Sequence, residues 1–467
     1  MGGLSKKAQQ FELTAAESKL PHITLDGGAL LFKDLRLTRG QEQGEMLTAQ
    51  AIVKAYNLMG YQAVGVSKYD LTAGLDFLRQ ISRESKFSWL SANLVNKKDH
   101  HPVFKPEILL TAGSIKIGVT ALTGPAAGKL LKGQALLLPW QDTLPAVIKD
   151  LSKRKSDIII LLSSLPPQAN KEIARRYQNI NILLQAAQDG SNIYPQPLAN
   201  TLICQTTKQG KSIGIMDINW QKSQKWGIDK AGLLRKDLNS LDRLDWRLAK
   251  YNQPEKEFKN LPAKLQVWRH LQGRRDKIQA EINRLKADIK NGRQNNPPST
   301  FKNHFIAMET NLPDNPEISR IVRNLNQEIN RLGRIRAGEI KAATESNYIG
   351  WRRCGKCHKA EVESWQRTRH AKAYETLVKK NRQYNLDCLF CHVTGIDRRH
   401  KLAALSVSTD LREVGCESCH GPGRAHAVRP GKNKMRQRPA RKICLNCHTP
   451  AHDSSFNYAT DIKLVHP

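Results

Sequence analysis

The sequence predicts a multidomain α+β protein with three parts of different character. From about residue 20 to 225, short β-branched runs alternate with amphipathic stretches, which is typical of a layered α/β domain. From about 226 to 345, long charged segments carry apolar residues at helical spacing. Residues 346–467 lack strand-like runs and are rich in cysteine, histidine, glycine and basic residues. We therefore expect domains at 1–225, 226–345 and 346–467, the last mostly α-helical.

Six runs in the first part predict buried strands, because they are short and rich in β-branched residues. They are residues 23–25, 63–66, 115–119, 158–162, 182–184 and 213–218. Amphipathic stretches between them, such as 46–58 and 171–177, predict helices. The alternation predicts helices packed on a sheet.

The middle part predicts helical hairpins that pack against a neighbour rather than form a site. One apolar stripe comprises Leu234, Leu238, Leu241 and Leu248, and a second comprises Ile278, Ile282, Leu285 and Ile289 before the expected C-cap Gly292. A third helix should begin with Asn315 as its N-cap and Pro316 in its first turn. Residues 291–299 are polar with two prolines and predict a loop.

The charge balance is strongly basic, with 75 Lys and Arg against 42 Asp and Glu and a formal net charge of +33. Such a field favours an acidic partner protein or an anionic surface, and nucleic acid is the less favoured choice. Self-assembly into a larger structure is kept as a separate alternative. No apolar run approaches the roughly 20 residues of a membrane span. We expect a protein that does not span a membrane.

Eight of the nine cysteines lie in C-x-x-C pairs, and a histidine directly follows each pair. The motifs are CGKCH at 354–358, CLFCH at 388–392, CESCH at 416–420 and CLNCH at 444–448. Two cysteines three apart can add their sulfurs to the two vinyl groups of one porphyrin, and the next residue can place its imidazole on the iron. The motifs predict four covalently bound haems c. The attaching residues are Cys354, Cys357, Cys388, Cys391, Cys416, Cys419, Cys444 and Cys447, and the proximal iron ligands are His358, His392, His420 and His448.

Zinc ribbons and disulfide frameworks also use paired cysteines, but neither requires a histidine after every second cysteine. With 14 histidines in 467 residues, four such coincidences have odds of roughly one in a million. Four macrocycles would also supply the apolar volume that residues 346–467 lack.

Five further histidines in this region are candidates for the second axial position. His370 lies in a helix-like segment after the first motif, His426 follows the third motif, and His466 is almost the last residue. We expect these three to be distal ligands and rank His400 and His452 behind them.

The runs WQRTRHAKAYETL, CLFCHVTG, VGCESCHGPGRAHA and CLNCHTPAHDSSFNYATDIKLVH resemble the tetrahaem cytochrome c-554 family in order and spacing over about 346–467. The resemblance implies distal ligands at positions like His370, His426 and His466. It also implies one five-coordinate haem, which we expect at the second motif and His392.

The runs ITLDGGALLF, AQAIVKAYNLMGYQAVGVSKYDLTAGLDFL, FSWLSANLV, IKIGVTALTGP and QGKSIGIMDI resemble the metallophosphoesterase domain of the 5′-nucleotidase family over roughly 20–220. The resemblance implies a metallophosphatase-like sandwich. In that family two metal ions activate water for phosphate ester hydrolysis.

The positions that match the metal ligands carry residues that cannot replace them. They are Ala29 for the bridging aspartate, Ser67-Lys68-Tyr69 for Gly-Asn-His, Ser164 for a histidine, and Ala186-Ala187-Gln188-Asp189 for Gly-His-x-His. No Asp-x-His precedes Ile23, and His22, His100 and His101 fall outside ligand positions. Because Lys68 would also repel a dinuclear metal centre, we expect a pseudophosphatase that serves as a scaffold, a docking module or a ligand site.

The leading functional hypothesis is electron transfer through the haems, with no nucleotidase activity. One alternative is an enzyme that reduces a small nitrogen or oxygen species at a five-coordinate haem, and another is a structural subunit of an extracellular electron conduit. Residues 1–10 lack the apolar core of a secretory signal. Because c-type haems are attached outside the bacterial cytoplasm, we expect a periplasmic or extracellular protein whose leader is missing from this sequence.

Overall fold

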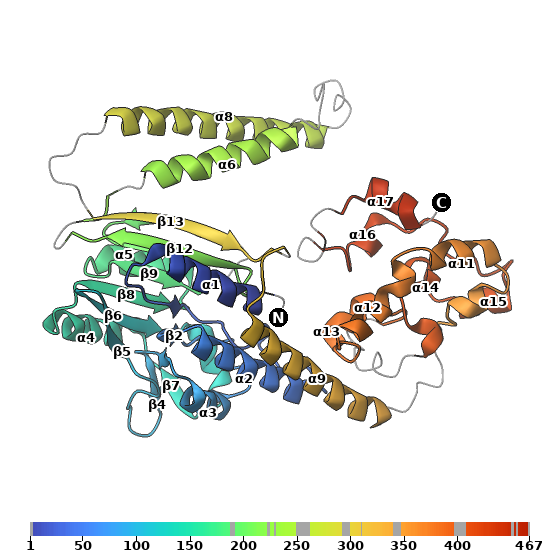
Figure 1. Ribbon diagram of the computed structural model, residues 1–467, viewed down its shortest axis with the longest axis horizontal. Coiled ribbons are helices and arrows are strands. Elements are labelled where there is room, and N and C mark those ends of the chain that lie inside the picture. The colour runs from blue at the N-terminus through green and yellow to red at the C-terminus, as the bar shows by residue number, and fades with distance from the viewer. Residues whose placement is uncertain are drawn as a thin grey trace. The chain divides into compact units, whose positions relative to one another are not determined.

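The computed structural model describes residues 3–186, 192–221, 225–227, 230–248, 262–291, 299–309, 311–339, 347–396, 408–449, 453 and 456–465. The chain forms two compact units (Figure 1). The N-terminal unit comprises residues 2–35 and 56–314, and the C-terminal unit comprises 36–55 and 315–467 together with Met1. The predicted multidomain α+β class is confirmed, whereas the boundaries near 225 and 345 stay predictions.

A six-stranded sheet forms the centre of the N-terminal unit, in the order β10-β11-β9-β8-β6-β5. The strands are β5 (Glu107–Ala112), β6 (Ile115–Leu122), β8 (Ile158–Ser163), β9 (Ile182–Gln185), β10 (Ile193–Leu198) and β11 (Thr201–Gln205). The four inner strands are parallel, and the two edge strands pair antiparallel with their neighbours.

A smaller parallel sheet has the order β1-β2-β3, with β1 at Leu25–Asp26, β2 at Ala63–Gly65 and β3 at Ser88–Leu90. Its middle strand contacts β6 and β8 of the large sheet. The short strands β4 (Leu94–Asn96) and β7 (Ala135–Leu137) form a separate antiparallel pair. The result is a two-sheet sandwich, as the metallophosphatase resemblance predicts.

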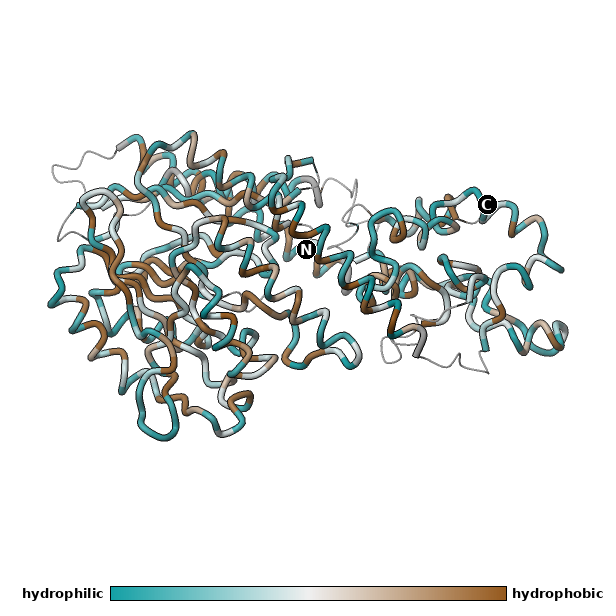
Figure 2. Tube along the Cα trace, turned by 60° about the horizontal axis from the view of Figure 1, so that its bottom comes forward, coloured by the Kyte–Doolittle hydropathy of each residue, from teal (hydrophilic) through white to brown (hydrophobic). Residues whose placement is uncertain are grey.

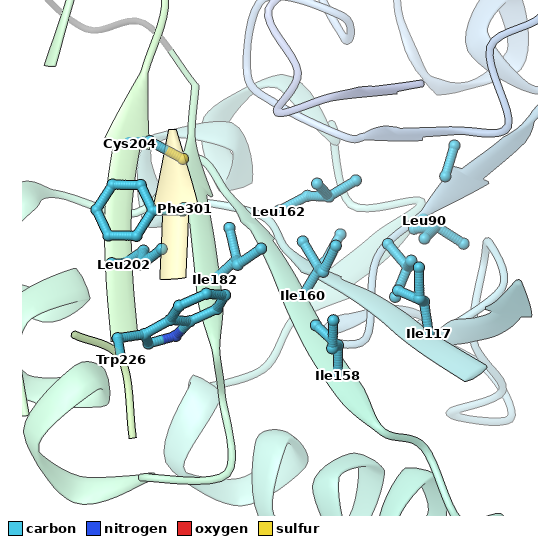
Figure 3. Close-up of a cluster of buried hydrophobic side chains, with 13 residues drawn as sticks. Leu90, Ile117, Ile158, Ile160, Leu162, Ile182, Leu202, Cys204, Trp226 and Phe301 are labelled. Carbon is cyan, nitrogen blue, oxygen red and sulfur yellow. The ribbon is translucent and has the colours of Figure 1, made fainter. Parts of the chain in front are cut away.

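Strand β8 explains how one apolar run serves two cores. Successive side chains of a strand point to opposite faces. Ile158, Ile160 and Leu162 therefore lie in the core between the sheets, where Figure 3 shows them among side chains from β6, β9 and β11. Ile159 and Leu161 point to the other face, which α4 (Trp140–Lys153) and α5 (Pro167–Arg176) cover.

The first helix, α1 (Leu4–Ser18), is anchored by a buried lysine. Lys7 Nζ donates to Tyr56 Oη at 3.0 Å, and that hydroxyl donates to Asp26 Oδ2 at 2.9 Å. The rings of Tyr56 and Tyr61 stack at 3.9 Å, with the ammonium above both. Tyr56 belongs to α2 (Glu42–Leu58), and α3 (Leu75–Glu84) follows β2. Lysine is rarely buried, so sequence pattern did not predict this contact.

Helices α6 (Lys230–Leu248) and α8 (Pro262–Asn291) pack as the predicted hairpin (Figure 1). They are antiparallel, since Lys230 pairs with Asp288 and Arg275 with Asp245. The seam consists of the buried residues Leu241, Leu244, Ile282 and Leu285. Leu238 and Ile289 of the predicted stripes are exposed, because the packed seam covers only part of each apolar face. Gly292 lies outside the described residues.

One strand lies where the sequence predicted only helices and loops. Strand β13 (Thr300–Ala307) pairs antiparallel with β12 (Ser212–Asn219) along its full length. The hairpin of α6 and α8 is thus inserted between two paired strands. In β13 buried positions alternate with exposed ones from Thr300 to His304, and Phe301 is buried in the core between the sheets.

Helix α9 (Pro316–Glu339) begins as predicted, because Asn315 Oδ1 accepts from the Ile318 amide at 3.0 Å. The helices after it are α10 (Trp351–Cys354), α11 (Lys359–Gln366), α12 (Ala373–Lys379), α13 (Leu386–His392), α14 (Cys416–His420), α15 (Arg424–Val428), α16 (Arg441–Cys444) and α17 (Tyr458–Val465). Short 3₁₀ turns are η1 (Pro125–Leu130), η2 (His370–Lys372) and η4 (Thr409–Leu411).

The C-terminal unit has little aliphatic core. A small apolar cluster comprises Leu377, Leu386, Leu389 and Val393. Figure 2 shows the brown, apolar segments gathered mainly in the larger part of the chain, while the coloured part that ends at the label C is mostly teal and white. Across the ranges that the structure describes, no helix is both long enough and apolar enough to cross a membrane.

Candidate functional site

Each C-x-x-C-H motif lies on a short helical turn. In the first motif, the amides of Cys357 and His358 donate to the Cys354 carbonyl at 3.2 and 3.0 Å. The fourth motif repeats this geometry, with Cys447 and His448 donating to Cys444 O at 3.1 and 2.9 Å. Residues three and four apart lie on one side of a helical turn. The turn therefore directs two thiols and one imidazole to the same side.

All eight motif cysteines are at least partly exposed. Cys204, by contrast, is buried, and burial raises its pKa to about 12. A thiol in that state is inert, because the thiolate is the reactive form. Burial thus separates Cys204 from the eight motif cysteines.

The thiols of three motifs are near enough to influence one another. The Cys354 thiol donates a hydrogen bond to Cys416, which raises the pKa of Cys354 and lowers the pKa of Cys416. Burial, together with the neighbouring Cys444 and Cys416, raises the pKa of Cys419 to about 11. Electrostatic interactions thus link thiols of the first, third and fourth motifs.

Two pairs of imidazoles face each other across gaps of one size. The ring centroids of His358 and His426 are 6.1 Å apart, and those of His370 and His448 are 6.0 Å apart. A metal–imidazole bond is about 2 Å long, so two imidazoles on opposite sides of one metal ion have centroids about 6 Å apart. Each pair could therefore hold one iron between its rings.

The Nδ1 atoms of three of the four motif histidines are engaged by oxygen acceptors. His392 Nδ1 lies 2.7 Å from Ala373 O, and His420 Nδ1 hydrogen-bonds Arg436 O. His448 Nδ1 lies 2.8 Å from an oxygen of Asp453. A carbonyl oxygen can only accept, so Nδ1 carries the proton and Nε2 keeps its lone pair. This arrangement is typical of metal-bound histidines, whose other nitrogen donates to a carbonyl or carboxylate.

The two facing histidines outside the motifs, His370 and His426, also lie in surroundings that favour metal binding. His426 Nδ1 hydrogen-bonds Asn433 O at 2.8 Å. Burial lowers the pKa of His370, and the nearby His448 lowers it further. Both effects favour the neutral imidazole, which is the form that binds a metal.

The three remaining candidate ligands lie outside the described residues. His400, His452 and His466 all belong to segments that the structure does not describe. Among the residues it does describe, no imidazole faces His392, and no group of three or more His, Cys, Asp or Glu side chains converges as a closed metal site would require. The spacing of the two facing imidazole pairs fits paired axial ligation.

Glu417, the second residue of the third motif, holds the unit together. This buried carboxylate accepts from the amides of Gly350 at 2.8 Å and Gly423 at 2.7 Å, and from Ile349 at 3.0 Å. It thereby fixes the segment before the first motif against the loop after the third. Sequence reasoning missed it, because the middle positions of C-x-x-C-H have no assigned chemistry.

Thr394 connects the second motif to the third. Its buried hydroxyl donates to Glu413 O at 2.8 Å and accepts from the Gly415 amide at 2.8 Å. The same oxygen lies 3.0 Å from Ser418 Oγ, inside the third motif. The first and second motifs are therefore both tied to the third by hydrogen bonds.

The segment 424–442, which we call the basic loop, covers one side of the third motif. It contains eight Lys and Arg residues and no Asp or Glu, and all eight are exposed. Arg436 also donates to Cys419 O at 3.0 Å. A strongly positive surface thus lies directly beside a motif.

A second candidate site is a pocket of about 100 Å³ in the N-terminal unit. It lies at the carboxyl ends of β1, β2, β6, β8 and β9, where α/β proteins place their ligands. Its lining residues are Ala29, Ser67, Lys68, Tyr69, Gly124, Pro125, Ala126, Ser164, Pro166 and Ala186. All four sequence elements that match lost metal-ligand motifs contribute to this pocket. Residues 187–189 of the last element lie outside the described residues.

The pocket walls are held by hydrogen bonds where the family places metal ligands. Ala29 keeps a left-handed φ of 63°, and its amide donates to Ser67 Oγ at 2.9 Å. Asp70 accepts from the amides of Leu30 and Leu31 at 2.8 and 3.0 Å. Burial raises the pKa of Asp70, against these hydrogen bonds, which lower it. Ser164 Oγ accepts from the Gly124 amide at 2.9 Å.

Comparison with known proteins separates the two parts of the chain. The family model of cytochrome c554 and c-prime matches residues 353–421. Cytochrome c-554 of Nitrosomonas europaea is 39% identical over 97 residues, which cover 18% of this chain and 41% of that protein. The C-terminal part is therefore similar to the cytochrome c-554 family, as the resemblance predicts.

The N-terminal part is homologous to the 5′-nucleotidase family. Protein UshA of Salmonella pullorum is 33% identical over 104 residues, which cover 22% of this chain and 19% of that protein. Two 5′-nucleotidases from Vibrio species also match this chain. The structure of a 5′-nucleotidase precursor from Thermus thermophilus is 19% identical, with a TM-score of 0.41 over 47% of this chain and 46% of that one. The chain spans less than half the length of each of these relatives.

Replacing Glu417 by Gln should destabilise the C-terminal unit. An amide offers one acceptor oxygen in place of two, so at least one buried backbone amide loses its partner, at a cost of about 1–3 kcal/mol. We expect a lower thermal midpoint by circular dichroism of the haem-loaded protein. Glu363→Gln on the exposed face of α11 is the matched control and should change little. Equal midpoints for both variants would contradict the role given to Glu417.

Proposed function

We propose that this chain is an electron-transfer protein that carries four covalently bound haems c in its C-terminal unit. The residues that would attach them are Cys354, Cys357, Cys388, Cys391, Cys416, Cys419, Cys444 and Cys447, with His358, His392, His420 and His448 as proximal ligands. Haem iron supplies reversible one-electron chemistry. The observation that carries the proposal is the helical turn of the first and fourth motifs, which directs two thiols and one imidazole to the same side.

The facing imidazoles support an assignment of axial pairs. His426 would bind opposite His358, and His370 would bind opposite His448. Each pair takes its second ligand from a different part of the chain, so the haem sites and the fold would depend on one another. His466 remains the proposed ligand for another iron, with His400 and His452 as further candidates.

Among the described residues no imidazole faces His392 or His420, so one of these two irons is the candidate for an open position, and we propose the one at His392. This observation favours a second function in which a small nitrogen or oxygen species is reduced at that iron. The Nδ1 bond of His392 to Ala373 O would hold the proximal ligand in place while the other side stays open.

The proposed partners are acidic redox proteins, which would dock on the basic loop. Complementary charge accelerates encounter and orients the partners. Residues 346–467 carry 23 Lys and Arg against 10 Asp and Glu, a balance of +13. We propose a periplasmic or extracellular location, because haem attachment to C-x-x-C-H takes place outside the bacterial cytoplasm.

The N-terminal unit would act as a scaffold or docking module and not as a phosphatase. Ala29, Ser164 and Ala186 offer no metal-binding group of the kind a dinuclear centre needs, and Lys68 adds a positive charge to the same pocket. No hydrolysis of nucleotides is expected with added divalent metals.

The haem content tests the central proposal. The pyridine haemochrome assay should give about four haems per chain, and reductive titration should consume about four electrons, because each iron accepts one. The double change Cys388→Ala with Cys391→Ala should reduce both values by about one. Cys204→Ser is the control and should leave both unchanged. A count below four in the unaltered protein would overturn the proposal.

Electron paramagnetic resonance tests the axial ligands. His426→Ala should convert about a quarter of the ferric iron from low spin to high spin, since one of four irons loses a ligand. His304→Ala, at an exposed position of β13, should have no effect. The unaltered protein should already show one high-spin iron if the site at His392 is open, and a wholly low-spin spectrum would exclude that site.

Charge reversal tests the docking surface. Lys432→Glu with Lys434→Glu should slow reoxidation by ferricyanide about tenfold at low ionic strength, and added salt should reduce the difference. Reoxidation by the hexaammineruthenium(III) cation should not slow. The matched control is Lys149→Glu with Lys153→Glu on α4, where the residues are equally basic and lie outside the basic loop. Equal slowing by both pairs would show that only net charge matters.

A further inference from the structure

Among the described residues that line the pocket of the N-terminal unit, one side chain is charged. That residue is Lys68, and none of the other described lining residues carries a carboxylate. These other groups are neutral, so none of them cancels the ammonium charge. A pocket with these walls favours an anion on electrostatic grounds.

Lys68 is half-buried and has no polar partner within the described part of the chain. It makes no hydrogen bond or ion pair there, and its ammonium lies 5.1 Å from the centre of the Tyr69 ring. The nearest acid in the sequence, Asp70, is fully buried. Its carboxylate already accepts hydrogen bonds from the Ser67 hydroxyl and from the backbone amides of Leu30 and Leu31. The charge of Lys68 is therefore available to a ligand.

Two further groups at the pocket also favour an anionic ligand. The Tyr69 hydroxyl has no hydrogen-bond partner among the described residues, so it can donate to a ligand. Pro166 lines the pocket and is the N-cap of α5, whose positive helix end therefore lies beside it. Ser164 does not contribute, because its proton is directed to Val66 O or Leu122 O.

We propose that this pocket binds one small inorganic oxyanion, of phosphate or sulfate size, with Lys68 as its principal ligand. The inference goes beyond the scaffold role and stands independently of the haems. The volume of about 100 Å³ limits the ligand, since pockets for larger organic molecules usually span about 300 Å³ or more. The ammonium thus takes the place of the two metal ions in neutralising an anion, without activating water.

Calorimetric titration of the full haem-loaded protein with inorganic phosphate tests the proposal, at constant ionic strength set with chloride. One saturable site per chain is expected. Lys68→Met should weaken binding about tenfold or more, because a charge-assisted hydrogen bond is lost. Lys68→Arg should stay within a few fold, and Lys149→Met controls for the loss of one exposed lysine. Equal affinity in Lys68→Met and Lys149→Met would overturn the proposal.

A second variant guards against misfolding of Lys68→Met. Ala126→Asp adds a carboxylate to the lining and should also abolish phosphate binding, while the circular dichroism spectrum stays unchanged. Titration with adenosine monophosphate separates a free ion from a phosphate ester. Binding no tighter than that of phosphate is expected, and much tighter binding would refute the small-ion assignment.

Discussion

A single helical turn sets the geometry of every C-x-x-C-H motif, because residues i, i+3 and i+4 share one side of the backbone. Turns this short are not stable in isolation. Buried polar groups hold them instead: Glu417 fixes the first motif against the third, and Thr394 fixes the second against the third. The third motif therefore acts as the hub of the C-terminal unit. The positions of the other motif histidines depend on it.

Sequence reasoning succeeded where one local pattern determines the structure. The unbroken apolar run at 158–162 can only be a buried strand in this context, and β8 lies there. Strand β13 was missed because it depends on pairing with β12, about 80 residues away in the chain, and its own pattern contains Lys302, Asn303 and His304. Strands of three residues, such as β3, are too short to show a period.

The candidate site residues likewise fall into two groups: those that a local pattern predicts and those that only tertiary packing brings together. The motif cysteines and histidines could be named from spacing alone, because the covalent chemistry requires that spacing. Which distal imidazole faces which motif could not, since His370 and His448 are brought together by tertiary packing. The pocket residues were identified through family resemblance. The anchoring carboxylates Asp70 and Glu417 carry no sequence signature, because their ligands are backbone amides.

The insertion of α6 and α8 has a consequence for how this chain can vary. The two ends of this insertion meet where the Gly227 amide donates to Ser299 O at 2.8 Å and where Trp226 forms a β-bridge with Ser299. The chain therefore leaves and re-enters the N-terminal unit at nearly one point. Segments with adjacent ends tolerate changes in length without disturbing the strands that flank them. The hairpin could be lengthened, shortened or exchanged for another small module while β12 and β13 keep their register.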